Sequence, residues 1–237
     1  MKARPMSCLC GLGIALVVLS PVSGQTSTPP PTPTQIALPS GPELLQKMKE
    51  AVRAAGSGGW TIRVPGTGSW VLLSTFEIDV SGAVPRSHYV QHARPPLTQL
   101  GLGRRDERIV VGKREAFRST YGGWICSVNS RVHLDEFKLV YLPLVLTNVV
   151  TVGEEQIAGA TAWHVRAHSI EKNSIDTIQT RLDFYIDEAT MLLLRRDQTT
   201  IVYKRGRRVP GTGMVRMNYS KYGVPIQIIL PEHCRAR

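Results

Sequence analysis

Two hydrophobic patterns follow one another along the chain, and the first is helical. Near residue 40, apolar residues recur at helical spacing: Leu44, Leu45, Met48 and Val52. Ser40 and Glu43 have the spacing of a capping box, Pro42 suits a first helical turn, and Gly56 is a typical stop. We therefore predict an amphipathic helix between Ser40 and Gly56.

After Gly59 the period changes to two, which is typical of half-buried strands. Gly112-Lys113 separates two of these stretches and predicts a hairpin. The expected strands are Leu72–Val80, Ser87–Ala93, Glu107–Val111, Glu115–Tyr121, Trp163–His168, Arg181–Ile186, Leu192–Tyr203, Val215–Tyr219 and Ile226–Leu230. A long series of this kind curls into a barrel or an open half-barrel.

The segment from Asp135 to Val152 breaks the alternation. It is too apolar for a surface helix, and Pro143 divides it into short helical pieces. Two interpretations stay open: ordinary core that covers the sheet, which we favour, or a helical lid over a cavity. The architecture is then an N-terminal helix, a long antiparallel sheet and an apolar helical insert.

The first residues have the features of an export signal. Lys2 and Arg4 precede the apolar run Cys8–Leu19, and small residues follow it at 22–24. We predict a signal peptide over residues 1–24, cleaved before Gln25. The alternative is an uncleaved anchor, for which the run is short of the roughly 20 apolar residues that a span needs.

Composition divides the remaining chain into a spacer and one domain. Residues 25–39 are rich in threonine and proline and cannot form a core, so we expect an extended tether. Residues 40–237 are enough for a single domain.

The positions of the cysteines predict an oxidising compartment and no lipid anchor. A lipoprotein needs a cysteine directly after the apolar run, whereas Cys8 and Cys10 stand at its start. We therefore expect that the protein is not a lipoprotein. Cys126 and Cys234 are predicted to form a disulfide outside the cytoplasm, with two free thiols as the alternative.

The chain is basic, with a formal net charge of +11 that falls to +9 without Lys2 and Arg4. A basic exported protein meets anionic surfaces first. Arg104-Arg105 is one basic run, and a second has four cations around a glycine: Lys204, Arg205, Arg207 and Arg208. This second run either contacts an anionic membrane surface or is a solvated loop. We find no nucleic-acid-binding motif, and we expect no nucleic acid partner.

Motifs for catalysis or metal binding are missing from the sequence. His88/His92 and His164/His168 are four residues apart, but both pairs lie in strand patterns, where that spacing spans about 13 Å. The sequence has no Gly-x-Ser-x-Gly elbow and no phosphate loop. We therefore expect that the protein is not an enzyme and that it has no catalytic residue, metal or cofactor.

The order of several short motifs resembles a known superfamily. These motifs are Glu107–Gly112 with Phe117 and Trp124, Val152–Gly159 with Trp163–Val165, Phe184–Asp187 with Thr190 and Leu192–Arg195, and Tyr219–Pro225 with Pro231. Together they cover about residues 43–231. The chain resembles the LolA-like superfamily and, within it, the LppX/LprG group of exported lipid-binding proteins. Many members of that group are lipoproteins, and the disulfide is not expected from the resemblance.

The resemblance implies a fold class and a function. The fold is α+β and mostly antiparallel β, a curled half-barrel sheet closed by an N-terminal helix and a helical insert. The implied function is carriage of lipids or acylated lipoproteins outside the cytoplasm, in a secreted, periplasmic or envelope-associated protein. We expect a monomer.

Our hypothesis is that the inward faces of the strands and the insert line an apolar cavity. The residues expected to bind lipid are Phe76, Ile78, Val111, Phe117, Trp124, Leu139, Leu142, Leu146, Val165, Phe184, Ile186 and Met217. The alternative is a secreted β-rich interaction or envelope-sensing module with a filled core. A weaker third interpretation is a secreted hydrolase, which needs a cluster of polar residues in a cleft.

Overall fold

Antiparallel strands dominate the structure, a computed structural model that describes residues 37–92, 106–119, 122–128, 145–172, 174–209 and 213–235. In these ranges the strands are β1 (Ser57–Pro65), β2 (Trp70–Asp79), β3 (Arg86–Gln91), β4 (Glu107–Val111), β5 (Arg114–Arg118), β6 (Ile125–Val128), β7 (Thr147–Ile157), β8 (Ala160–Lys172), β9 (Asp176–Asp187), β10 (Leu193–Lys204), β11 (Arg207–Arg208) and β12 (Gly213–Ser220). The helices are α1 (Gly41–Ala55) and α3 (Glu232–Arg235).

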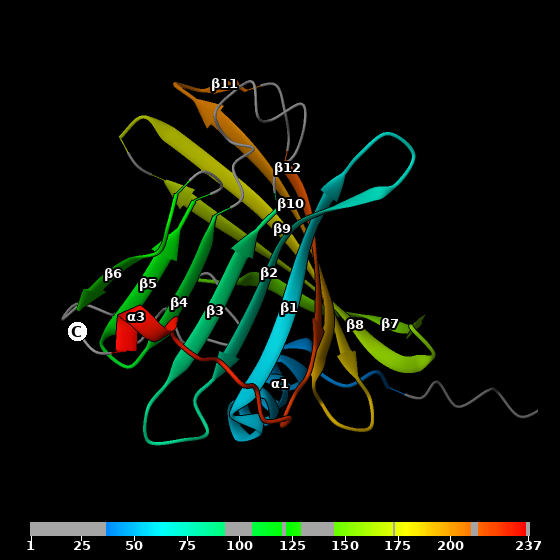
Figure 1. Cartoon of the computed structure of the whole chain (residues 1–237). Coiled ribbons are helices and arrows are strands. Elements are labelled where there is room, and N and C mark those ends of the chain that lie inside the picture. Colours follow the sequence, from blue (N-terminus) through cyan, green and yellow to red (C-terminus); the bar gives the residue numbers. More distant parts are fainter. Residues whose placement is uncertain are drawn as a thin grey trace, which may run out of the picture. The chain divides into compact units, whose positions relative to one another are not determined.

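The strands form one curled sheet that stays open. Its order is β6-β5-β4-β3-β2-β1-β12-β10-β9-β8-β7, and β11 pairs with β10. Because β6 and β7 are the two edges of this path, the described strands make a half-barrel and not a closed barrel (Figure 1). The predicted fold class, mostly antiparallel β curled into a half-barrel, is therefore confirmed.

Helix α1 confirms the N-terminal helix but not its predicted cap. Gly56 ends the helix in the left-handed conformation, with φ at 68°, and its N–H donates to the Arg53 carbonyl. The Ser40 side chain makes no capping hydrogen bond. Glu43 instead pairs with Lys47 one turn later, at 2.7 Å, so the capping box is wrong.

The two faces of the sheet bury different clusters. The face that packs against α1, here called the inner face, includes Ile78 and Val110. The opposite, outer face includes Ile109 and Ala116. Neighbours in sequence separate in this way because successive side chains of a strand point to opposite faces.

A C-terminal segment covers part of the outer face. Residues 224–231 lie outside any helix or strand, although Ile226, Ile228 and Leu230 are buried against Ile109 and Ala116. Figure 1 shows this red segment running across the strands to α3. The predicted strand Ile226–Leu230 is therefore wrong: its alternation reflects packing onto a face and not pairing along an edge.

Strands β1 and β7 were not predicted as strands from the sequence. Strand β1 was not among the expected strands. The last residues of the expected helical insert, Thr147 to Val152, belong to β7, where β-branched side chains suit the ladder with β8. That part of the helical prediction is wrong. Val145 and Leu146 precede β7 outside any helix or strand, and residues 135–144 of the insert lie outside the described ranges.

The described residues from Ala37 onward form one compact unit. The expected signal peptide and residues 25–36 of the spacer lie outside the described residues. Among the helices that the structure describes, none combines the length and apolar character needed to cross a membrane.

Candidate functional site

The inner face carries a cavity of about 240 Å³ beside strands β2, β3 and β4. Phe76, Ser87, Tyr89 and Arg108 line it. Antiparallel register places these side chains together, because Phe76 stands opposite Tyr89 and Tyr89 stands opposite Arg108. At about 30 Å³ per water-sized group, the cavity has room for roughly eight such groups.

Aromatic rings form one wall of the cavity and continue beyond it. Phe76 stacks on Trp60 with ring centroids 4.3 Å apart, and Trp60 lies 5.9 Å from Tyr219. Tyr89 closes the other side at 6.2 Å from Phe76. Burial raises the pKa of the Tyr89 hydroxyl, which donates a hydrogen bond to Gln91 at 3.2 Å. This wall presents rings and neutral polar groups.

Arg108 brings a charge to the cavity, but an acid accompanies it. Its Nε donates to Glu115 Oε1 at 2.5 Å, and both side chains are partly buried. Since the pair is neutral overall, the cavity has no net charge from these two residues. It suits an apolar chain better than a free anion.

Helix α1 fills the inner face next to β7 and β8. Leu44, Leu45, Met48 and Val52 pack there with side chains from the sheet, and Met48 is fully buried. The sheet residues of this cluster include Val165, Ala167, Leu182, Phe184, Ile186 and Leu193. The inner face is therefore packed at one end and hollow at the other.

The structure separates the twelve residues expected to bind lipid. Phe76 lines the cavity. Side chains that face inward or pack in the α1 cluster are Ile78, Phe117, Leu146, Val165, Phe184, Ile186 and Met217. Val111 and Trp124 instead pack under the C-terminal segment on the outer side, so their placement in a shared cavity is wrong. Leu139 and Leu142 lie outside the described residues.

Three cavity residues were missed: Ser87, Tyr89 and Arg108. The hypothesis of a purely apolar lining excluded these polar positions. The alternation of β3 contained the missing signal, because Ser87 and Tyr89 share a face with period two.

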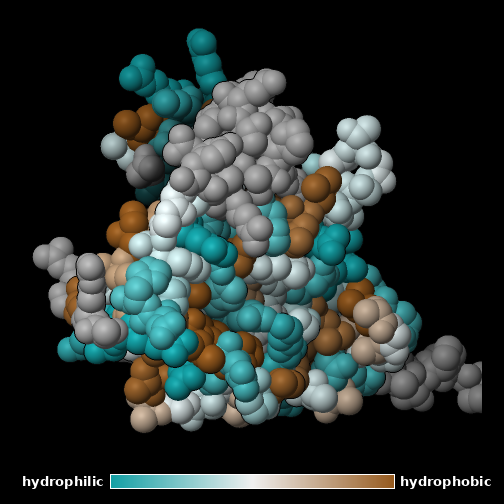
Figure 2. Space-filling model, in the orientation of Figure 1, coloured by the Kyte–Doolittle hydropathy of each residue, from teal (hydrophilic) through white to brown (hydrophobic). Residues whose placement is uncertain are grey.

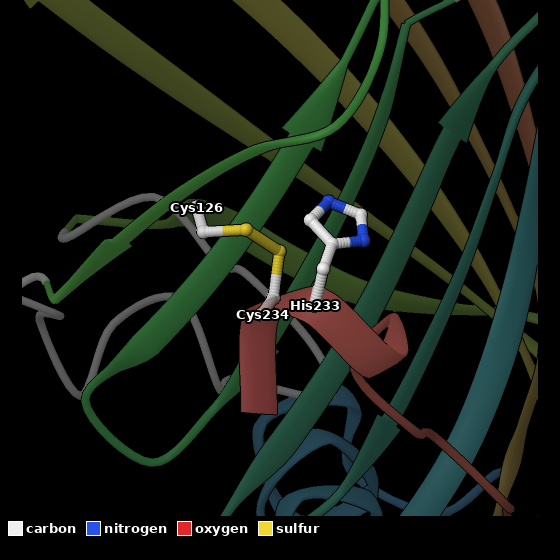
Figure 3. A group of neighbouring side chains, drawn as sticks. All are labelled: Cys126, His233 and Cys234. Atoms are coloured by element: carbon white, nitrogen blue, oxygen red, sulfur yellow. A yellow bond between two sulfur atoms is a disulfide. The ribbon is translucent and has the colours of Figure 1, made fainter. Parts of the chain in front are cut away.

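The predicted disulfide is present on the outer side, between Cys126 in β6 and Cys234 in α3. His233 lies beside it, and the nearest side-chain atoms of the three residues are all within 4.8 Å (Figure 3). This is the spacing of a metal site. However, both sulfurs are bonded to each other and are not available as thiolate ligands.

Two of the four histidines considered as metal ligands, His88 and His164, contact acidic side chains on the outer face. His88 Nε2 lies 2.9 Å from Glu107, and His164 Nε2 lies 2.9 Å from Asp183. Burial raises the pKa of Asp183, but hydrogen bonds from His164 and Arg166 outweigh it and lower the pKa to about 2. These contacts link neighbouring strands of the sheet.

The second basic run forms the tight turn expected between strands. Lys204 ends β10, Arg205 and Gly206 make the turn, and Arg207-Arg208 is β11. All four basic side chains are exposed. Figure 2 shows hydrophilic side chains projecting at the end of the sheet where Figure 1 labels β11. Arg104 and Arg105 lie outside the described residues.

The open sheet and its N-terminal helix define a half-barrel protein with an LppX-like fold. A solved structure that shares it is the lipoprotein LppX of Mycobacterium tuberculosis, with 12% identity, a TM-score of 0.52, and coverage of 79% of this chain and 97% of that one. A DUF1329 family protein from Desulfovibrio piger gives 11% identity, a TM-score of 0.28, and coverage of 79% and 93%. No family model matches the chain. No curated protein matches it either.

Proposed function

We propose that the protein is an exported, non-catalytic carrier that holds an acyl chain on the inner face of its half-barrel. The observation that carries this proposal is the aromatic cavity beside β2, β3 and β4, which has no net charge from Arg108 and Glu115. The resemblance to exported lipid-binding proteins supports the same class of ligand. The Cys126–Cys234 disulfide supports a location outside the cytoplasm.

The volume of the cavity limits what it can hold. A methylene group occupies about as much space as a water molecule, so roughly eight carbons fit into 240 Å³. At about 0.8 kcal/mol per buried methylene, this segment contributes about 6 kcal/mol. The proposed ligand is therefore a lipid whose longer chain also contacts protein surface beyond these four lining residues.

Native mass spectrometry and lipid extraction of the purified protein test the proposal. We expect a mass shift that organic extraction removes, and a lipid in the extract. Wild-type protein that carries no lipid and takes up no added fatty acid would contradict it.

A substitution that fills the cavity makes the test specific to this place. Ser87→Leu adds apolar volume at a lining position, and we expect it to weaken fatty acid uptake at least tenfold. Ser220→Leu is the matched control, because Ser220 is exposed at the end of β12 and should change uptake less than twofold. Ser87→Val gives an intermediate step, and equal melting temperatures establish that each variant is folded.

A second candidate function is an interaction or envelope-sensing module with a filled core. The packing of α1 against β7 and β8 favours it, because Met48 and Phe184 leave that part of the inner face filled. Such a protein would purify without lipid and would lose nothing on Ser87→Leu.

We also propose that the carrier touches an anionic membrane surface with Lys204, Arg205, Arg207 and Arg208. Their exposure on one hairpin supports this contact. Each basic residue near such a surface contributes about 1 kcal/mol at most. Transfer of lipid between membranes needs contact of this kind and no oligomer, so we expect the carrier to act as a monomer.

A further inference from the structure

The basic hairpin, residues 204–209, has a second turn of the sheet as its neighbour. The turn between β8 and β9 lies beside it, because the Arg205 N–H donates to the Ile175 carbonyl at 2.9 Å. Register agrees: Thr177 of β9 stands opposite both Lys172 of β8 and Tyr203 of β10. We call the described residues of these two turns, 171–172, 174–176 and 204–209, the paired tip.

Charge on the paired tip is strongly positive. Lys172 joins the four cations of the hairpin, and all five side chains are exposed. Glu171 and Asp176 are the acids of the same two segments, which leaves a net charge of +3. Charge complementarity therefore selects an anionic partner.

The paired tip also exposes aliphatic side chains between its cations. Ile175 is 50% exposed and Val209 is 38% exposed. In a loop that only faces water, exposure of these two aliphatic side chains gives no stabilisation. A partner surface with an apolar layer behind its charges binds both the cationic and the aliphatic side chains. A phospholipid bilayer has that order of charge and apolar layer.

The backbone of the hairpin holds one cation in an unfavourable conformation. Arg205 and Gly206 both have positive φ, at 49° and 76°, as a two-residue hairpin turn requires. Asparagine, aspartate or glycine normally takes the first of these positions, because other side chains are strained there. Arg205 therefore places a positive charge at the apex of a short turn, although its left-handed backbone conformation is unfavourable for an arginine.

From these observations we propose that the paired tip docks on anionic phospholipid bilayers, with the cations at the head groups and Ile175 inserted between them. This inference rests on the proposed membrane contact and deepens it: the contact uses two turns and includes an apolar anchor. It requires no lipid in the cavity.

Vesicle co-flotation tests the docking. The probes are vesicles of phosphatidylcholine with phosphatidylglycerol, and vesicles of phosphatidylcholine alone. We expect binding to the first that weakens with salt, and little binding to the second. Arg205→Gln/Arg207→Gln removes two charges and should weaken binding about 25-fold, at about fivefold per charge. Lys49→Gln/Lys113→Gln, which removes two exposed charges elsewhere, is the matched control and should stay within twofold.

Ile175→Ser separates insertion from attraction by charge. We expect it to abolish the binding that persists at high salt and to leave the salt-sensitive part in place. If wild-type binding depends on salt but Ile175→Ser has no effect, the apolar anchor is wrong and the simpler cationic contact stands. If Arg205→Gln/Arg207→Gln binds as the wild type does, the membrane contact is wrong. If a soluble polyanion such as heparin captures the Ile175→Ser protein and displaces the vesicles fully, the membrane is the wrong partner. Cargo measured in parallel by mass spectrometry keeps this outcome separate from the carrier proposal.

Discussion

The disulfide between Cys126 and Cys234 gives the sharpest stability prediction. It joins residues 108 positions apart and fixes α3 to strand β6. In the chain-entropy account, closing a loop of this length stabilises the folded state by about 4–5 kcal/mol. Typical domains are stable by only about 5–15 kcal/mol, so reduction should remove at least about a quarter of the free energy of unfolding.

The noncovalent contacts of the C-terminal segment should persist without the sulfur bond. Ile226, Ile228 and Leu230 stay able to pack on Ile109 and Ala116, so we expect a destabilised fold and not an unfolded chain. For a domain of about 200 residues, each kcal/mol shifts Tm by about 2–4 °C, which gives a decrease of about 10–20 °C.

Thermal unfolding with and without dithiothreitol measures this decrease. Cys126→Ser/Cys234→Ser should unfold at the temperature of the reduced wild type, and dithiothreitol should not change its Tm further. A decrease of less than about 3 °C in both experiments would refute the loop-closure reasoning, since it corresponds to only about 1 kcal/mol. It would mean that aliphatic packing alone keeps the segment in place.

Three further predictions concern the sheet and the helix. Asp183→Asn should destabilise the fold by about 2 kcal/mol, because Arg166 and Arg181 lose their carboxylate. The stability of the wild type should fall as pH drops from about 4 toward the lowered Asp183 pKa of about 2. Urea titrations should show that the variant lacks this pH dependence. Met48→Ala should cost about 2–5 kcal/mol in chemical denaturation, since the side chain is fully buried. Gly56→Ala should lower stability by about 1 kcal/mol because φ is 68° there, whereas Gly123→Ala should be neutral.

The sequence pattern predicted those elements in which the spacing of apolar residues matches the buried face. Helix α1 and the hairpin of β4 and β5 follow the sequence closely. Strand β1 was missed even though Trp60 and Ile62 alternate with polar residues, because Gly58-Gly59 has the composition of a turn. Gly59 is in fact a point of close approach: a Cβ there would lie 3.1 Å from the Phe76 carbonyl oxygen.

Alternation did not predict which partner each strand would find. Ile226 and Leu230 have the spacing of a strand, but their segment begins and ends beside prolines, which lack a ladder donor, and it packs across a face. For the same reason, alternation did not predict which face of the sheet each candidate site residue occupies. Val111 and Val110 differ by one position, and only the register of the whole sheet decides that Val110 faces α1 while Val111 faces the C-terminal segment.

The inner face of the sheet has a packed part and a hollow part, and this difference allows the two candidate functions, lipid carrier and filled-core module, to be distinguished. One part is packed by α1, and the other is hollow beside Phe76 and Tyr89. Before the cost of association, a segment of roughly eight carbons contributing about 6 kcal/mol corresponds to a Kd of about 40 μM. Each further buried methylene tightens binding about fourfold, so a submicromolar Kd needs about three more carbons in contact with protein. A measured dependence of Kd on chain length therefore distinguishes the two functions: a steady fourfold gain per carbon beyond eight indicates an extended lipid site, whereas no gain indicates a closed void in a filled core.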